Sequence, residues 1–317
     1  MNGIIPLNDT FDLTNDGDIL ADLLADKRSP NTRDAYEKDL KDFFVTMTGQ
    51  PPNPALVAQF LQLDRFNAQA LVLKYKQRLV ERNLKEATIN RRLAAIKALV
   101  RYAAKIGKCA ISLSDIKSEK VTPYRDTTGI SPDAFKKMLA VSDRDTLKGK
   151  RDYAILRLLW DNALRRSEVA QADILDLDLD AKTLNILGKG KGTQKQAISL
   201  SNAAVLALQD WLVARGELNK KQPLFVALDP SSYGKRLSTT SIYKIVQATA
   251  TAAGITKTIS PHRIRHSSVT AALDATNGDV RRVQKLSRHA SLNTLMIYDD
   301  NRLNHQGEIT DLLADLV

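Results

Sequence analysis

A polar stretch without periodicity, residues 117–128, divides the sequence into two parts of different character. It reads Lys-Ser-Glu-Lys-Val-Thr-Pro-Tyr-Arg-Asp-Thr-Thr, a composition typical of a linker. The residues before it show helical patterns, whereas residues 129–317 mix helical patterns with short β-rich segments. The segments at 183–187 and 196–199 predict a hairpin with a Lys/Gly tip, and the run 224–228 is a candidate third strand. A chain of 317 residues is long enough for two domains. We therefore predict a mainly α protein with a small β-sheet, built from an all-helical domain at 29–116 and a mixed α/β domain at 129–317.

The helical part carries positive charge on one face of a predicted helix. Over residues 88–105, apolar side chains recur at helical spacing and place Ile89, Leu93 and Ile96 on a common buried face. A single-sign stripe on a helix fits a DNA backbone or groove, whereas an ordinary solvated face is usually mixed in sign. The polar and basic stripe opposite the apolar face, which we predict to contact DNA, consists of Asn90, Arg91, Lys97, Arg101 and Lys105.

The distribution of charge along the chain indicates a nucleic-acid partner. Lys and Arg outnumber Asp and Glu by 47 to 36, which gives a net charge of +11. Residues 1–26 carry −6 and residues 299–317 carry −4, so residues 27–298 carry +21. A basic body is typical of proteins that bind nucleic acid, and a basic enzyme without a polyanionic partner is the alternative. We interpret residues 1–28 as an acidic N-terminal extension.

Composition excludes several classes of protein and site. A single cysteine, Cys109, rules out a disulfide framework and a thiolate metal cluster. The histidines at 262, 266 and 289 have no carboxylate partner at metal-ligand spacing, so we predict no metal and no other cofactor. No apolar run approaches 18 residues and no basic leader opens the chain. We expect no membrane association and a cytoplasmic, nucleoid-associated location.

Groups suited to cleaving a phosphodiester without metal occur in separate motifs of the second part. Such a reaction needs cations for the nonbridging oxygens, a nucleophile, and an acid for the leaving oxygen. Arginines clamp phosphate oxygens, a lysine on a hairpin tip can donate a proton, and histidine can shuttle one. Each motif alone is typical of ordinary surface or core positions. The motifs are Ala-Leu-Arg-Arg-Ser-Glu at 163–168, Gly-Lys-Gly-Lys-Gly at 188–192, Pro-His-Arg-Ile-Arg-His at 261–266, His289 and Tyr298.

At these motifs the sequence resembles the tyrosine recombinase, or phage integrase, family over residues 29–298. The runs Asn-Thr-Arg-Asp-Ala-Tyr at 31–36 and Thr-Ile-Asn-Arg-Arg-Leu at 88–93 are similar to its core-binding domain. The matching elements of its catalytic domain, in order, are the box at 163–168 (Gly-Leu-Arg-x-Ser-Glu in the family), the hairpin lysine Lys189, the His-x-x-Arg-His box at 262–266, His289 and Tyr298.

The resemblance implies a site-specific DNA recombinase of the simple Xer or Cre type, because the core-binding pattern begins near residue 29. Tyr298 would attack the scissile phosphate and form a 3′-phosphotyrosyl bond, while Lys189 would protonate the departing 5′ oxygen. A homotetramer on double-stranded DNA would exchange strands through a Holliday junction, without ATP, metal or cofactor. The other residues implied are Arg165, His262, Arg265 and His289 as catalytic groups, Glu168 and His266 as their supports, and Lys191 as a DNA contact.

The sequence departs from the family pattern at two places, and two other functions stay open. Ala163 replaces the usual Gly, and Ser-Arg at 287–288 replaces the usual Leu-Gly before His289. A type IB topoisomerase would use a similar set of residues to relax DNA without exchanging strands, but that family has Lys-x-x-Arg where this chain has His-x-x-Arg-His. A DNA-binding protein without catalysis is the other alternative, and the intact motif set counts against it.

The final segment, residues 305–317, predicts a short amphipathic helix that needs a receiving groove. Ile309, Leu312, Leu313 and Leu316 follow the spacing i, i+3, i+4 and i+7, which gives one apolar face. A helix of this length is not stable alone in water. The resemblance implies that the helix docks on a neighbouring protomer in a cyclic exchange. The alternative is that it folds back onto its own catalytic domain.

Overall fold

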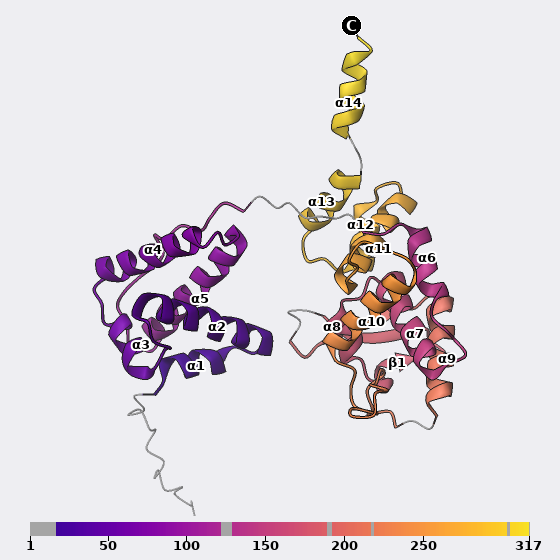
Figure 1. The fold of residues 1–317 in the computed structure, drawn as a ribbon, viewed down its shortest axis with the longest axis horizontal. Coiled ribbons are helices and arrows are strands. Elements are labelled where there is room, and N and C mark those ends of the chain that lie inside the picture. Colours follow the sequence, from indigo (N-terminus) through magenta and orange to yellow (C-terminus); the bar gives the residue numbers. More distant parts are fainter. Residues whose placement is uncertain (1–16, 122–128, 189–191, 217–218, 303–304, 317) are drawn as a thin grey trace, which may run out of the picture. The chain divides into compact units, whose positions relative to one another are not determined.

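The computed structural model describes residues 17–121, 129–188, 192–216, 219–302 and 305–316, and its internal contacts divide the chain into residues 1–124 and 125–317 (Figure 1). Over its described residues the first unit is helical. Proline and glycine set the limits of its second helix, because Pro30 begins that helix and Gly49, at φ +77°, ends it. The helices of the unit are α1 (Ile19–Asp26), α2 (Pro30–Thr48), α3 (Pro54–Leu61), α4 (Arg65–Glu81) and α5 (Glu86–Lys105).

An aromatic cluster fills the core of this first unit. Phe43 and Phe44 from α2 meet Phe60 from α3 and Tyr75 from α4 in edge-to-face contacts, with ring centroids 5.1–6.1 Å apart. All four rings are nearly or fully buried. The apolar face predicted over 88–105 packs into the same core from α5, so that Ile89, Leu93 and Ile96 are buried as predicted.

Asp42 anchors the polar edge of this core. Its carboxylate accepts a hydrogen bond from the Tyr75 hydroxyl at 2.7 Å and two from the Arg82 guanidinium at 3.0 Å, and it also pairs with Arg92. Burial alone would raise the pKa of Asp42, but the hydrogen bonds from Arg82 and Tyr75 bring the pKa below its ordinary value.

Helix α1 corrects one sequence-based boundary. The acidity of residues 1–28 indicated an extension outside the helical domain, but Leu20 and Leu23 of α1 are buried in the core of the first unit. Asp18 caps the helix by accepting from the backbone N–H groups of Leu20 and Ala21. The acidic side chains lie on the outer face of an amphipathic helix whose apolar face joins the core, so residues 19–26 belong to the helical unit.

The second unit combines helices with a small antiparallel sheet, which confirms the predicted fold class. The helices between residues 132 and 275 share with the sheet one large apolar core. The described elements are α6 (Pro132–Ala140), α7 (Leu147–Asp161), α8 (Arg166–Gln171), a 3₁₀ turn η1 (Ile174–Asp176), β1 (Leu177–Asp178), β2 (Thr183–Leu187), β3 (Lys195–Ser199), α9 (Asn202–Arg215), α10 (Thr239–Ala252), α11 (Pro261–Ala275), α12 (Val280–Ser287), α13 (Asn293–Arg302) and α14 (His305–Ala314).

The sheet contains the predicted hairpin but a different third strand. β2 pairs with β3 in antiparallel register from Thr183 opposite Ser199 to Leu187 opposite Lys195, and β1 pairs with the free edge of β2. The run 224–228, which we interpreted as a possible strand, is not one. Its apolar side chains are buried, but its backbone finds partners outside the sheet, through bridges such as Val226 with Arg236. Apolar content alone therefore misled the prediction there.

A second, smaller cluster lies among α11, α12 and α13. It joins Val269 and Leu273 of α11 to Val283 of α12, Leu295 of α13 and Ala163 of the α7–α8 turn. Three of the sequence motifs meet at this cluster, through Ala163, through helix α11 and through Tyr298 of α13, so the cluster brings those motifs into one region of the unit.

Candidate active site

Arg165 lies at the N-terminus of α8, where a left-handed turn ends α7 and reverses the chain. Ala163 occupies that turn with φ +45°. Glu168, the third residue of α8, is 1% exposed and accepts two hydrogen bonds from Arg165, one from its backbone N–H at 2.8 Å and one from its guanidinium at 2.7 Å. The carboxylate therefore fixes both ends of Arg165, and this arrangement leaves part of the guanidinium facing solvent.

Helix α11 carries the His-x-x-Arg-His box on one face, because residues three and four apart are neighbours on a helix. Pro261 begins the helix and Ser260 caps it through the N–H of Arg263. Arg265 is 2% exposed and donates to the backbone carbonyls of Ala163 and Ser287. Burial, with repulsion from neighbouring guanidinium groups, lowers the pKa of Arg265 to about 10, so it stays cationic at neutral pH.

His289 and Tyr298 complete the cluster. The Nε2 atom of His289 lies 3.3 Å from a guanidinium nitrogen of Arg265. The Tyr298 ring lies near two imidazoles, with its centroid 5.0 Å from that of His266 and 6.0 Å from that of His289, and His262 packs on His266 at a centroid distance of 4.1 Å. Tyr298 is 1% exposed and packs in the smaller apolar cluster. The structure thus brings together groups from positions 165, 262–266, 289 and 298, and it covers the tyrosine.

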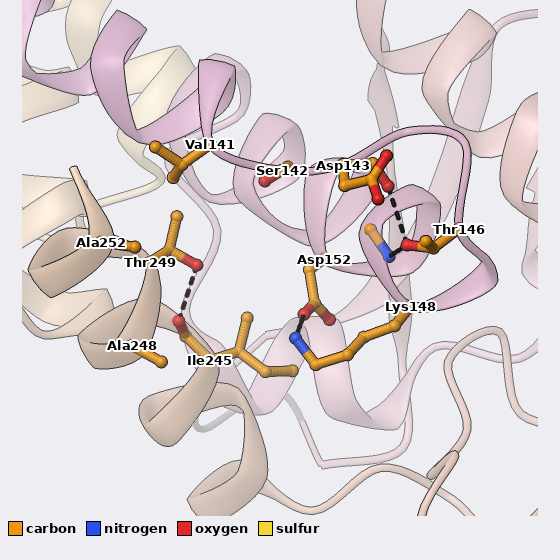
Figure 2. A pocket seen from close by; sticks show the side chains of 11 residues that line it. Val141, Ser142, Asp143, Thr146, Lys148, Asp152, Ile245, Ala248, Thr249 and Ala252 are labelled. Atoms are coloured by element: carbon orange, nitrogen blue, oxygen red, sulfur yellow. Dashed lines mark hydrogen bonds and ion pairs between the residues drawn. The ribbon is translucent and has the colours of Figure 1, made fainter.

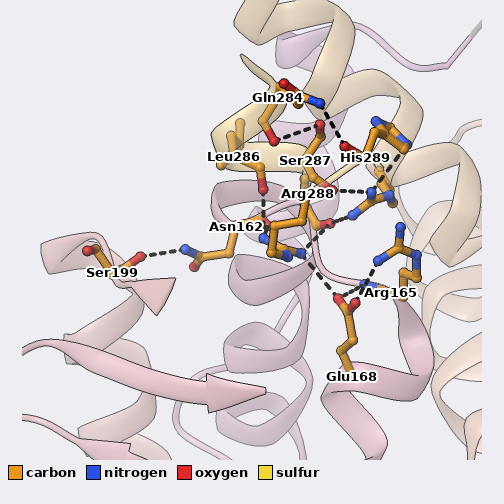
Figure 3. Close-up of polar contacts among 11 residues, drawn as sticks. Asn162, Arg165, Glu168, Ser199, Gln284, Leu286, Ser287, Arg288 and His289 are labelled. Atoms are coloured by element: carbon orange, nitrogen blue, oxygen red, sulfur yellow. Dashed lines mark hydrogen bonds and ion pairs between the residues drawn. The ribbon is translucent and has the colours of Figure 1, made fainter. Parts of the chain in front are cut away.

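Arg288 joins the same network, although we did not count it among the site residues. It ends α12 in a left-handed conformation with φ +55°. Its guanidinium donates to the carbonyls of Asn162, Ala163 and Leu286 and to the carboxylate of Glu168 (Figure 3). A charged residue at a helix end where the family usually has glycine is the signal that could have identified it.

Three guanidinium groups consequently lie in the region of one buried carboxylate, and two of them bind it. Arg165 and Arg288 bind Glu168, and Arg265 shares the Ala163 carbonyl with Arg288. One negative charge cannot neutralise three positive ones, so the region has a positive surplus. Fixed guanidinium groups in such a place suit the oxygens of a phosphodiester.

Two cavities open beside Arg165 and lead to this region. One, of about 430 Å³, is lined by Arg165, Tyr243, His262 and Arg265. The other, of about 520 Å³, is lined by Arg165, Glu168, Gly188, Lys285, Arg288 and His289. Gly188 ends the described part of the β2–β3 hairpin on one side. Lys189 and Lys191 lie outside the described residues, and their placement stays a prediction. Lys195, in β3 on the other side of the hairpin, pairs with the buried Asp176 at 2.6 Å.

The basic stripe of α5 is divided between structural and exposed residues. Asn90 exchanges two hydrogen bonds with the backbone of Glu119, and Lys97 donates to the Ile116 carbonyl. Arg91 pairs at 2.7 Å with Asp39, which is 2% exposed. These three therefore hold the first unit together, a role that the charge pattern did not predict. The two members of the stripe that are exposed without such an anchoring role are Arg101 and Lys105.

A further cavity, of about 350 Å³, lies between the N-terminal half of α7 and α10 (Figure 2). Its polar contacts are local, such as Lys148 with Asp152 and Thr249 with the Ile245 carbonyl. None of the motif residues lines it. Within the described parts of the chain, no group of three His, Cys, Asp or Glu side chains is placed to hold a metal ion. Over the same residues, no helix is both long and apolar enough to cross a membrane.

Comparison with known proteins gives the family of this chain. Residues 129–305 match the Phage integrase family, and residues 20–107 match the Phage integrase, N-terminal SAM-like domain. The chain belongs to the phage integrase family. Tyrosine recombinase slr0733 from Synechocystis sp. is 56% identical to this tyrosine recombinase, with 94% of this chain and 95% of that protein covered. Tyrosine recombinase Synpcc7942_B2651 from Synechococcus elongatus is 53% identical, with 95% and 94% covered.

The fold agrees with solved recombinase structures. The crystal structure of XerH site-specific recombinase bound to palindromic difH substrate matches this tyrosine recombinase with a TM-score of 0.63 and 22% identity, over 88% of this chain and 80% of that one. The protein is a tyrosine-type site-specific recombinase, and neither a type IB topoisomerase nor a DNA-binding protein without catalysis is favoured. The match to the SAM-like domain from residue 20 agrees with the packing of α1 into the helical unit.

Proposed function

We propose that this recombinase cleaves and rejoins DNA at the cluster of Arg165, Arg265, His289 and Tyr298. One observation supports the proposal: four segments distant in sequence bring two guanidinium groups, an imidazole and a buried phenol into one cluster. Within it, Arg165 lines one cavity together with Arg265 and a second cavity together with His289. A phosphodiester held there would have its nonbridging oxygens bound by Arg165, Arg265 and His289. Such preformed cations stabilise the charge that develops on these oxygens as the phosphorus becomes five-coordinate.

In the cleavage step the Tyr298 oxygen attacks phosphorus and the bond to the 5′ oxygen breaks. The product is a 3′-phosphotyrosyl bond and a free 5′ hydroxyl, which takes its proton from Lys189. His262, at the end of the row of rings that leads through His266 to Tyr298, assists removal of the phenolic proton. Rejoining is the reverse reaction with the 5′ hydroxyl of another strand, and it needs no ATP because the ester energy is retained.

Tyr298 must become accessible before it can attack, because its side chain is 1% exposed. The residues that cover it come from α11, α12, α13 and the Ala163 turn. Movement of α13 relative to α11 would expose the phenol and leave the arginines in place. We therefore propose that assembly on DNA controls when the nucleophile is delivered.

Assembly would use the apolar face of α14. Ile309, Leu312 and Leu313 of α14 and Leu316 just after it are 56–79% exposed, which supports docking on a partner over folding back onto the same catalytic domain. A neighbouring protomer on double-stranded DNA would receive it, in a cyclic homotetramer that exchanges strands through a Holliday junction. Such an enzyme would act where DNA is, at the nucleoid. Arg101, Lys105 and Lys191 are the cations that we propose touch the DNA.

Covalent trapping tests the nucleophile. A library of random duplexes with a nick would be incubated with the protein, and DNA that stays attached under denaturing conditions would be sequenced to obtain the target. We expect Y298F to bind that target and form no adduct. Y243F is the matched control, because Tyr243 lines the cavity next to Arg165 and is the nearest competing phenol there. An adduct with Y298F, or its loss in Y243F, would assign the nucleophile elsewhere.

A further inference from the structure

Arg288 adopts a backbone conformation that arginine rarely takes. Its φ of +55° and ψ of +37° close the last turn of α12, where its N–H bonds to the Gln284 carbonyl. Glycine is the usual residue at such a helix end, because any side chain makes the left-handed region unfavourable. A second residue with φ above zero, Ala163 at +45°, lies at the other end of the Arg288 side chain. Two unfavourable turns are thus joined by one guanidinium group.

The hydrogen-bonding groups of Arg288 point into the protein. One terminal nitrogen donates to Asn162 O at 3.1 Å and Leu286 O at 2.6 Å, and the other donates to Ala163 O at 3.3 Å and Glu168 Oε2 at 3.2 Å. Only 10% of the side chain is exposed. Because both terminal nitrogens are used internally, Arg288 is not placed to act as a phosphate ligand itself.

The partners of Arg288 are the atoms that hold the catalytic groups. Glu168 orients Arg165 through its backbone and its guanidinium. The Ala163 carbonyl also receives Arg265. Arg288 directly precedes His289, so the backbone conformation of Arg288 determines the position from which the His289 side chain extends (Figure 3). The Arg288 side chain therefore connects the end of α12 to the turn before α8. It binds the Glu168 carboxylate and the Ala163 carbonyl, which are the acceptors that also hold Arg165 and Arg265.

We propose that Arg288 is a positioning residue for DNA cleavage, which holds Arg165 through Glu168 and Arg265 through the Ala163 carbonyl in fixed relation to His289. The proposal rests on the proposed function of these three groups. It differs from a general stabilising role in one respect. A positioning residue changes the rate of the chemical step in correctly folded, DNA-bound protein, whereas a stabilising residue changes how much of the protein is folded.

Single-turnover cleavage separates these two roles. The probe is a nicked duplex with the sequence that the wild-type protein selects by covalent trapping. R288G removes the guanidinium and leaves a residue that tolerates the left-handed turn, so backbone strain is not added. We expect R288G to cleave at least about tenfold more slowly with saturating protein, since small misplacements of binding groups are costly in rate. The affinity for the duplex and the final amplitude of adduct should stay within about twofold.

A matched control and a second variant keep the outcome clear. R281A removes the same charge from an exposed position of the same helix and should cleave at the wild-type rate. If R288G does not fold, R288K tests the proposal in its place. Lysine keeps the charge but cannot donate to acceptors on both sides, so R288K should also cleave more slowly than the wild-type protein. Wild-type rates in R288G or R288K, or a loss in R288G that affects the amplitude alone, would overturn the proposal.

The route through Glu168 has its own test. The fold-decrease of the cleavage rate in the double variant R288G/E168Q should be at least about threefold smaller than the product of the fold-decreases in R288G and E168Q. The two changes are expected to overlap because both release the guanidinium of Arg165. Multiplicative losses would show that Arg288 acts independently of Glu168 and would overturn this route. Absence of any adduct from wild-type protein would instead contradict the proposed function, so the two failures are distinguishable.

Discussion

The apolar face of α14 gives a prediction whose size follows from the structure. Fully burying an aliphatic side chain contributes about 1.5–3 kcal/mol. Leu312 and Leu313 are each 60% exposed, so docking on a neighbouring protomer can still gain somewhat more than half of this burial free energy from each side chain, or about 2–4 kcal/mol for the pair. Aspartate at both positions removes this gain and adds the cost of burying charge. At about 1.4 kcal/mol per factor of ten, each protomer contact should weaken by roughly 30- to 700-fold or more.

The assay compares L312D/L313D with wild-type protein on DNA that carries one or two selected target sites. We expect binding to one site within about twofold of wild type, because the change lies outside the proposed DNA contacts. Assembly on paired sites and formation of recombinants should be lost. L206D is the control, since Leu206 of α9 is 59% exposed and belongs to another helix. Normal tetramers and recombinants from L312D/L313D, or equal loss of one-site binding, would refute docking through α14.

Three further predictions concern DNA contact and stability. R101A/K105A should flatten the slope of log affinity against log salt by about 0.9 for each phosphate that the variant no longer binds, and an unchanged slope would place both side chains away from DNA. D42N should lower the free energy of unfolding at pH 7 by about 1.5–3 kcal/mol, because the charged hydrogen bonds are removed. The pKa of Asp42 is lower in the folded protein than in the unfolded chain, so the stability that Asp42 contributes is present above the unfolded pKa and is lost as the pH falls through the folded pKa. Urea titrations of D42N and the wild-type protein should therefore converge in acid. A difference that stays constant with pH would contradict this role of Asp42. G149A should destabilise by about 1–3 kcal/mol in the same titrations, although alanine normally favours a helix, because its Cβ would lie 1.7 Å from the Asp143 carbonyl oxygen; a more stable variant would refute this.

Local patterns in the sequence were sufficient for the elements that depend on near neighbours. The apolar face of α5, the proline and glycine that limit α2, and the β2–β3 hairpin all follow from spacing and from the conformations that particular residues favour. The residues at 165, 265, 289 and 298 were predicted through the resemblance of their motifs to the tyrosine recombinase family, and in the structure they lie in one region.

Contacts between distant residues were decided only by the tertiary structure. The apolar run 224–228 gave no sign that its backbone partners lie outside the sheet, and Asn90 and Lys97 gave no sign that they bind residues 116–119. The physical reason is that a hydrogen-bond partner far along the chain leaves no periodic signal in sequence. Arg288 shows the same limit most clearly. Its sequence position indicates only a charge where glycine is usual, and its role follows from four acceptors that folding brings within reach of one side chain.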